Sequence, residues 1–277
     1  MLGPNGAGKT TTIKMLTTLL IPTSGKASVL GLDVERDFMA VRKRINLISG
    51  GERGLYYRIS GRQNLRFFSD LYRIPGSLRD RRVDELLTMV GLAEAADRRV
   101  EEYSRGMKQR LHIARGLVND PEVLFMDEPT IGLDPEISRE VRLLVRDLSR
   151  KGKTILLTTH DMREAEELCD RVNIISHGNI VGRGTVRDLK DAVKDKTIIE
   201  VEAREMPPDV IRSVRSLDGV KSIMTKADGH MPMARIQVSD GRDMMSAIAS
   251  KFEGCHLIRI SSEEPTLEDA YMNMVNK

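Results

Sequence analysis

The sequence predicts an α/β protein with two domains, and three observations support this prediction. Residues 3–11 are rich in glycine and lead into a helical pattern, while an apolar run at residues 123–126 ends in two carboxylates. After residue 194, strand and helix patterns follow in the order β-α-β-β-α-β, which is typical of a split βαβ sandwich. The chain has 277 residues, which suits about two domains, and we expect them at residues 1–193 and 194–277.

The glycine-rich segment matches the pattern Gly-x-x-x-x-Gly-Lys-Ser/Thr, in which successive backbone N–H groups form a nest for phosphate oxygens. Lys9 is placed to contact β- and γ-phosphates, and the Thr10 hydroxyl to ligate Mg²⁺. A helix that follows from Thr11 would direct its N-terminus at the anion. An ordinary glycine-rich turn would not need this many specified residues at this spacing. The candidate nucleotide-binding residues of this segment are Gly3, Pro4, Asn5, Gly6, Ala7, Gly8, Lys9, Thr10 and Thr11.

The next part of the chain alternates strands with helices and then becomes helical. The pattern predicts a β segment at residues 26–34, a charged helix at 35–44 and a strand at 45–49. From about residue 61 to residue 118 the periodicity is helical, so we expect a helical subdomain inserted in the α/β core. Within it, Ser77 is expected to cap a helix.

Ser104 is a good N-cap for the last helix of this subdomain, in which Met107, Leu111 and Ala114 form an apolar stripe. A helix N-terminus with a Ser hydroxyl and a glycine, Gly106, is a second place that can hold phosphate. A capped amphipathic helix without any ligand would show the same residues. From these residues alone both interpretations stay open.

Two carboxylates, Asp127 and Glu128, follow the apolar run at residues 123–126. A continuous apolar run is typical of a buried parallel strand, and functional side chains gather at the carboxyl ends of such strands. Asp127 is placed to reach Mg²⁺, directly or through water, and Glu128 to polarise a water that attacks a γ-phosphate. The alternative is a strand that simply ends at solvent.

Asp134 and His160 belong to the next two elements. Asp134 is predicted to cap an amphipathic helix that ends before Gly152. The strand predicted at residues 154–160 ends at His160, the position at which ligands bind in parallel α/β sheets. The other histidines have no such placement, and we expect them at the surface or in packing. A β-hairpin is predicted at residues 172–182.

The second domain shows no catalytic cluster in its sequence, and residues 191–196 are expected to form the linker to it. Its predicted strands lie at residues 197–202, 219–226, 232–238 and 256–261, and its predicted helices at 208–216, 240–252 and 265–275.

Composition excludes several classes of protein. With 44 basic and 41 acidic residues the net charge is only +3, which argues against a nucleic-acid protein that binds through bulk charge. The absence of Trp disfavours base-stacking platforms. Cys169 and Cys255 show no metal-like spacing, so a reduced cytosolic protein is expected. No apolar run approaches the ~18 residues of a spanning helix and no signal peptide is visible, so any role at a membrane would run through a partner.

Taken in order, these motifs resemble the ATP-binding subunits of ABC transporters, of the daunorubicin-resistance and sodium-efflux exporter type. The match runs from Gly3 to about Val186, and residues 264–269 resemble that group's closing segment. The resemblance implies a P-loop NTPase core and an ATPase that powers an exporter of drug-like or other small substrates, with ATP and Mg²⁺ as cofactors. It also implies a homodimer of ATP-binding subunits, a transmembrane permease partner, no nucleic acid, and a cytoplasmic location on the inner face of the cell membrane.

The resemblance also gives each motif a role. The glycine-rich segment would be the Walker A loop, and Asp127 and Glu128 would be the Walker B pair. The segment that begins at Ser104 would be the signature motif, which binds the γ-phosphate of the ATP held by the other subunit. Asp134 would lie in the loop that crosses the dimer interface, and His160 would sense the γ-phosphate. Helices around residues 61–90 would touch the permease.

The sequence departs from the family pattern at three places. Arg105 and Met107 stand where many members carry Gly and Gln, and Glu52 is the candidate to replace a Gln near Mg²⁺. The strands and the adenine-stacking aromatic that usually precede Gly3 are absent. A central strand would bury three or more large apolar side chains, each contributing ~1.5–3 kcal/mol. We therefore expect Met1 to be a misassigned start, or the chain to be a fragment.

Other functions fit the sequence less well. A soluble ABC-type ATPase that acts on DNA or ribosomes would carry long heptad arms or two ATPase units in one chain, and the sequence shows neither. A GTPase would need an Asn-Lys-x-Asp guanine reader, which we do not find. A binding protein without hydrolysis is disfavoured because Glu128 and His160 are both present.

Overall fold

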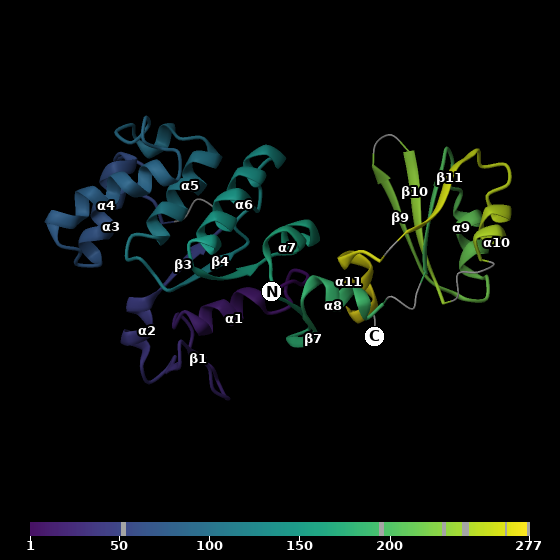
Figure 1. The fold of residues 1–277 in the computed structure, drawn as a ribbon, viewed down its shortest axis with the longest axis horizontal. Helices are drawn as coiled ribbons and strands as arrows, with labels where there is room; N and C mark the ends of the chain where they lie inside the picture. Colours follow the sequence, from purple (N-terminus) through teal and green to yellow (C-terminus); the bar gives the residue numbers. More distant parts are fainter. Residues whose placement is uncertain (51–53, 194–196, 229–230, 240–243, 264, 276–277) are drawn as a thin grey trace. The chain divides into compact units, whose positions relative to one another are not determined.

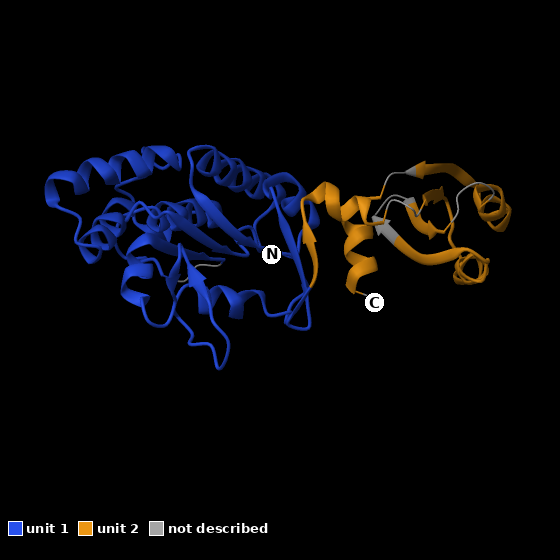
Figure 2. Ribbon diagram, turned by 60° about the horizontal axis from the view of Figure 1, so that its bottom comes forward, with its two compact units in different colours: residues 1–180 blue, residues 181–277 orange. Residues whose placement is uncertain are grey.

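The structure is a computed structural model that describes residues 1–50, 54–193, 197–228, 231–239, 244–263 and 265–275. The chain divides into two compact units, Met1–Ile180 and Val181–Lys277 (Figure 2). This division lies ahead of the boundary that the sequence predicts between residues 193 and 194, which stays a prediction. It falls within strand β7 (Asn179–Gly184), the second strand of the predicted hairpin, which pairs with β6 (Val172–Ser176).

The first unit is built on three parallel strands in the order β3-β4-β5. They span Ile45–Ser49, Val123–Asp127 and Thr154–Thr158, close to their predicted positions, so the predicted α/β core is confirmed. The central strand, β4, is buried on both faces because its alternate side chains enter two different clusters. Leu124 and Met126 pack with apolar residues of α5 (Arg105–Gly116) and α6 (Pro135–Arg150).

The other face of β4 is covered by helix α1 (Lys9–Leu16) and helix α2 (Phe38–Arg44). Here Val123 and Phe125 pack with Ile13 of α1 and Val41 of α2. Figure 1 shows α1 on one side of these strands and α5 and α6 on the other. The sheet is therefore the middle layer of three, and its carboxyl ends are left free to carry function.

The helical subdomain contains α3 (Gly61–Leu71), α4 (Gly76–Met89), a 3₁₀ turn η1 (Val100–Glu102) and α5, within the predicted residues 61–118. Helix α3 begins with a capping box between Ser60 and Gln63 that the sequence analysis did not identify. The prediction that Ser77 caps a helix is wrong. Pro75 occupies the N-cap position of α4 in an extended conformation, so Ser77 already lies in the first turn.

Two further elements near the N-terminus differ from the prediction. Helix α1 begins at Lys9 and ends at Leu16, so Leu19 and Leu20 lie beyond it and are exposed. Thr18 adopts a positive φ of 61°, which ends the helix. The β segment expected at residues 26–34 is two short antiparallel strands, β1 (Ser28–Val29) and β2 (Leu32–Asp33).

The second unit contains a four-stranded antiparallel sheet in the order β11-β8-β10-β9. Its central strands, β8 (Thr197–Ala203) and β10 (Met231–Val238), place Ile199, Val201 and Ile236 in one apolar cluster with residues of α9 and α10. This order and alternation are those of the predicted split βαβ sandwich. The remaining elements are α9 (Pro208–Arg215), β9 (Val220–Asp228), α10 (Met244–Lys251), β11 (Leu257–Glu263) and α11 (Leu267–Val275).

Two short helices have no counterpart in the prediction. Helix α7 (Met162–Leu168) follows His160, and α8 (Val186–Asp191) ends at the first residue of the predicted linker. Helix α8 has its own capping box, formed by Thr185 and Asp188. In the part of the chain that the structure describes, every helix is too short or too polar to cross a membrane.

Candidate functional site

The phosphate-binding segment starts from the fully buried Leu2, which bridges β5 and β6 in parallel. Leu2 N–H donates to the Asn173 carbonyl at 2.8 Å, and its own carbonyl accepts from Ile175 N–H at 2.8 Å. The Met1 amino group donates to the Leu157 carbonyl at 2.5 Å, and burial lowers its pKa. A Cβ on Gly3 would collide with the Ile175 carbonyl oxygen, so this close backbone approach needs glycine.

The loop itself has the backbone that a phosphate nest requires. Gly6 and Gly8 adopt positive φ values of 82° and 105°, and Gly8 is the N-cap of α1. The Ala7 carbonyl accepts a hydrogen bond from Gly178 N–H at 3.0 Å, which fixes the loop against the β6–β7 turn. The Lys9 ammonium folds back and donates to the Gly3 carbonyl at 2.6 Å and to the Pro4 carbonyl at 3.2 Å. The Lys9 side chain therefore connects the start of α1 to the first residues of the loop.

Glu128 lies at the centre of the predicted catalytic residues. Its Oε1 is 3.2 Å from Lys9 Nζ, and its Oε2 is 2.7 Å from His160 Nδ1. The contact with Lys9 is an ion pair without hydrogen-bond geometry, so among the described residues Oε1 is buried and accepts no hydrogen bond. Glu128 also holds a positive φ of 51°, and its N–H is donated to the Thr158 carbonyl at 3.1 Å. A strained carboxylate with one vacant acceptor fits a residue that receives a proton from water.

Asp127 accepts hydrogen bonds from two hydroxyl groups. Thr10 Oγ1 donates to Asp127 Oδ2 at 2.8 Å, and Thr158 Oγ1 donates to Oδ1 at 2.5 Å. The structure thus brings together both predicted metal ligands, Thr10 and Asp127. The sequence analysis missed Thr158, which is fully buried at the end of β5. Its place two residues before His160, on a strand parallel to that of Asp127, is the signal that could have identified it.

The residues of the predicted signature motif form a second group. Ser104 caps α5 by accepting from Met107 N–H at 3.2 Å, and Asp134 caps α6 by accepting from Ile137 N–H at 3.0 Å. A Cβ on Gly106 would come within 2.7 Å of Ile137 Cγ2, so the two helix N-termini are neighbours. Within the described residues no hydrogen bond or ion pair joins Ser104, Gly106 or Asp134 to the cluster around Glu128.

The loop expected to replace the family's Gln is described only at its edges. Glu52 lies outside the described residues. Gly50 N–H donates to the Asp127 carbonyl at 2.7 Å, and a Cβ on Gly50 would collide with the Glu128 carbonyl oxygen. Gly50 therefore lies directly against the backbone of Asp127 and Glu128, and that contact was not predicted.

A third carboxylate, Glu164, is fully buried in α7. It accepts a hydrogen bond from Thr130 Oγ1 at 2.9 Å, and burial raises its pKa, opposed by hydrogen bonds from Thr159 and Thr130. Thr130 belongs to the loop that follows Glu128. Glu164 thus links α7, which follows His160, to that loop.

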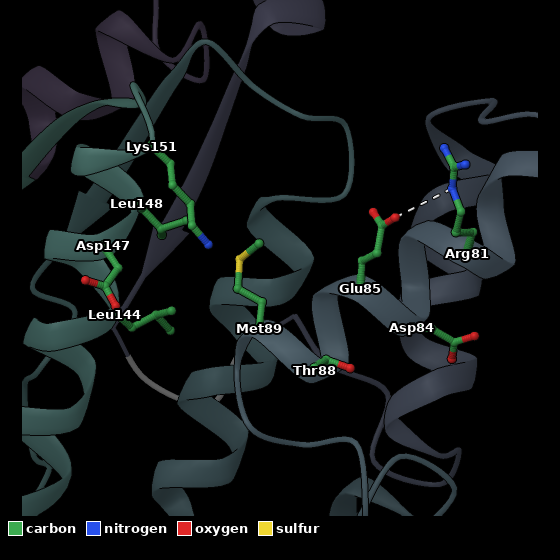
Figure 3. Close-up of a pocket in the computed structure, with 9 residues that line it drawn as sticks. All are labelled: Arg81, Asp84, Glu85, Thr88, Met89, Leu144, Asp147, Leu148 and Lys151. Carbon is green, nitrogen blue, oxygen red and sulfur yellow. Dashed lines mark ion pairs between the residues drawn. The ribbon is translucent and has the colours of Figure 1, made fainter.

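One pocket is remote from this chemistry. A groove of about 840 Å³ lies between α4 and α6, with Met89, Leu144 and Leu148 among its apolar lining (Figure 3). An exposed ion pair, Arg81 with Glu85 at 3.5 Å, stands at its edge. It contains no residue of the phosphate-binding cluster, so its size does not make it the site.

Comparisons with known proteins agree with this geometry. A family model described as "ABC transporter" matches residues 1–131, and one described as "ATP-binding protein DrrA1-3-like, C-terminal domain" matches residues 184–275. The daunorubicin resistance ATP-binding protein DrrA3 of Streptomyces coeruleorubidus is 37% identical over 276 residues, which cover 99% of this chain and 85% of that protein. The linearmycin resistance ATP-binding protein LnrL of Bacillus subtilis is 32% identical over 281 residues, covering 100% of this chain and 89% of the relative.

A solved structure shows the same fold. The cbiO1 protein of Clostridium perfringens, part of the ABC transporter complex cbiONQ, aligns with a TM-score of 0.63 and 30% identity over 69% of this chain and 79% of that one. This structure and the ABC transporter family model agree on a P-loop NTPase core. The chain therefore belongs to the ATP-binding subunits of ABC transporters, in the group of the daunorubicin-resistance proteins, and is an ATPase that powers export across a membrane.

Proposed function

We propose that residues 3–11 bind the phosphates of ATP, and that Glu128 and His160 carry out its hydrolysis. The observation that supports this is the position of Glu128 between two other candidate residues: its Oε1 lies 3.2 Å from Lys9 Nζ and its Oε2 lies 2.7 Å from His160 Nδ1. ATP would supply the phosphoryl group, and Mg²⁺ would neutralise its charge. Lys9 would exchange its ion pair with Glu128 for the phosphates.

Thr10 and Asp127 would hold the Mg²⁺ ion. A hydroxyl and a carboxylate oxygen are ligands that Mg²⁺ prefers, and two protein ligands suit an ion that is otherwise bound by water and phosphate. Glu128 would accept the proton of the attacking water at Oε1, the buried oxygen that has no hydrogen-bond donor among the described residues. His160 would hold the other oxygen in place through the 2.7 Å contact.

Ser104, Gly106 and Asp134 would act on a second subunit. Ser104 and Asp134 are exposed and lie in a group of their own, next to the free N-termini of α5 and α6. Helix N-termini attract anions. In a homodimer these residues would contact the γ-phosphate bound by the Walker A loop of the partner, so that two ATP molecules join the two subunits.

The surface around α3 would contact the transmembrane permease. We define the α3 aromatic face as Tyr56, Phe67, Leu71 and Tyr72, whose exposed fractions are 51%, 38%, 62% and 40%. An exposed apolar group of this kind marks a contact surface. Contact with a permease would place the protein on the cytoplasmic side of the membrane. The names of the relatives point to drug-like or other small molecules as the exported substrates.

The test is size-exclusion chromatography of the Glu128→Gln chain with and without Mg-ATP. We expect ATP to shift this chain from monomer to dimer, because the nucleotide is bound but not consumed. In the proposed dimer each nucleotide site is composite, made of the Walker A loop of one subunit and Ser104 of the other. Two added substitutions test these two halves separately. Lys9→Ala should abolish nucleotide binding, whereas Ser104→Glu should spare binding and prevent dimerisation by placing a negative charge where the γ-phosphate would lie.

Mixing these two variants provides the matched control. A dimer of one Lys9→Ala chain and one Ser104→Glu chain contains one intact composite site, so the mixture should dimerise with ATP although neither variant does alone. If the Ser104→Glu chain dimerised as well as its parent, or if the mixture stayed monomeric while the parent dimerised, the assignment of Ser104 to the partner's nucleotide would be wrong.

A further inference from the structure

Arg115, in the last turn of α5, makes three contacts that the nucleotide site does not explain. Its Nη1 donates to the Gly54 carbonyl at 2.8 Å, and its Nη2 donates to the Leu47 carbonyl at 3.4 Å. Its guanidinium carbon lies 5.1 Å from the centre of the Phe68 ring. Leu47 lies within β3 and Gly54 lies after the loop that follows this strand, so one side chain joins the strand to the far end of the loop.

Gly54 is fitted to this contact in two ways. It adopts a positive φ of 96°, and a Cβ at this position would collide with Arg115 Nη1. The guanidinium meets carbonyl oxygens here, and none of the described carboxylates forms an ion pair with it. Burial lowers the pKa of Arg115, so the protein holds this cation in place at a cost in solvation. Such a cost is typical of groups that serve function more than stability.

The third contact leads to the surface. The Phe68 ring lies 5.3 Å from the ring of Phe67, which in turn lies 4.8 Å edge-on from Tyr56. Phe67 and Tyr56 belong to the α3 aromatic face. A continuous set of contacts therefore runs from α5, whose first residues follow Ser104, through Arg115 and Phe68 to the surface proposed to meet the permease.

We propose that Arg115 is a positioning residue that makes α5, β3, Gly54 and the α3 aromatic face respond together when ATP binds. The inference rests on the proposed function, because it requires ATP to engage the Walker A loop and Ser104. The planar guanidinium supplies what the arrangement needs: two donors in a fixed fork and a flat cation that stacks on a ring.

Hydrogen exchange of the full Glu128→Gln chain, with and without Mg-ATP, tests this proposal. We expect ATP to slow exchange in α1 and also in residues 54–72, by about fivefold or more in the latter, the low end of coupling between sites. In the Arg115→Met chain the response of residues 54–72 should be lost while that of α1 persists. Arg115→Lys, which keeps the charge but not the fork, should restore part of it.

The matched control is Arg82→Met. Arg82 also donates to a backbone carbonyl near the end of α5, that of Leu117 at 2.9 Å, but it belongs to α4. Its other contacts among the described residues are ion pairs with Asp120 and Glu85, away from Gly54 and Phe68. In the Arg82→Met chain, ATP should slow hydrogen exchange of residues 54–72 as much as in the parent. A merely structural role for Arg115 would raise exchange without ATP and leave the ATP-induced change intact.

Three results would contradict these proposals. If residues 54–72 responded to ATP in Arg115→Met as in the parent, or did not respond in the parent although α1 did, this inference would be wrong. If ATP changed exchange nowhere in the parent, the proposed function itself would fail, and the two failures are therefore distinguishable.

Discussion

Each unit of the protein contains a cluster of ionisable side chains, and the two clusters are built differently. In the first unit, Lys9, Glu128 and His160 come from a loop and from the ends of two strands. In the second, Arg235 donates to Glu200 at 2.8 Å and to Asp269 at 2.9 Å. Arg235, Glu200 and Asp269 are all largely buried, whereas in the first cluster Lys9 and Glu128 are largely buried and the His160 side chain is 50% exposed.

The difference lies in what holds the charges. Arg235 and Glu200 are register partners on β10 and β8, so the sheet itself places them face to face. Asp269 also accepts from Thr266 Oγ1 at 2.7 Å, which fixes the start of α11. Glu128, in contrast, holds a positive φ and leaves one oxygen without a donor among the described residues. Arg235 Nε is likewise buried without an acceptor among the described residues, so the two clusters differ in how the backbone places them: the sheet register fixes Arg235 and Glu200, whereas Glu128 turns out of its strand beside Lys9.

The largest expected effect comes from Glu128→Gln, which tests the catalytic half of this comparison. General-base catalysis contributes about 10²–10⁴-fold to a rate, and the amide cannot accept the proton. We expect turnover of ATP to fall by that amount while nucleotide binding persists, as measured by single-turnover hydrolysis and equilibrium binding on the same preparation. Turnover at the parent rate would show that the vacant oxygen of Glu128 has no catalytic use.

The next effect comes from Arg235→Met, which tests the structural half. It leaves Glu200 and Asp269 buried without their cation, and breaking a buried pair in this way costs about 3–5 kcal/mol. We expect faster hydrogen exchange in β8 and β10, with Arg235→Lys much closer to the parent. The structural role of Arg235 would be contradicted if Arg235→Met left hydrogen exchange in β8 and β10 unchanged and lowered ATP turnover per folded molecule as strongly as Glu128→Gln.

Local sequence patterns point to each residue of the first cluster and to none of the second, for a physical reason. Lys9, Asp127, Glu128 and His160 each follow a local pattern, a glycine-rich loop or the end of an apolar strand. The pairing of Arg235 with Glu200 depends on the register of β10 on β8, which no local pattern records. The strands and helices of the second unit were nonetheless predicted, because each buries one face and so alternates.

The same limit explains the other misses. Thr158 and Gly50 reach Asp127 only after three strands align in parallel, and the contacts of Arg115 join residues far apart in the chain. Short helices such as α8 bury too few residues to give a periodic signal. The sequence could therefore locate each half of the nucleotide site, but the arrangement of its supporting residues required the fold.

Glu164→Gln is expected to change the free energy of unfolding less than Arg235→Met does, and to raise it instead of lowering it. Burial raises the pKa of Glu164 above its ordinary value of 4.5. Below that value the carboxyl is protonated in both the folded and the unfolded chain and carries no penalty. As the pH rises from that value through the higher folded pKa, the unfolded chain binds fewer protons than the folded one, so the stability contributed by this group is lost. The variant should therefore gain stability over the parent as the pH increases above 4.5. Urea unfolding at several pH values checks this, and an advantage that grew towards low pH would contradict it.

The smallest effect is expected for Arg81→Ala, at the edge of the groove between α4 and α6. Its side chain is 74% exposed in the pair with Glu85, and exposed pairs of this spacing contribute about 0.3–0.5 kcal/mol. Unfolding and ATP turnover should both stay close to the parent. A large change in either would show that this groove carries a role and that the comparison of the two clusters is incomplete.

The position of Met1 has a practical consequence for anyone who produces this protein. Its amino group lies between β5 and β6, and a groove of about 750 Å³ continues from it, lined by residues of β5 and by Asn173. Any residues joined to Met1, whether of the protein itself or of an affinity tag, would replace that amino group by an amide and continue beside the edge of β5, next to this groove. Purification handles are better placed at the other terminus, and measured stabilities should be compared only between chains with the same first residues.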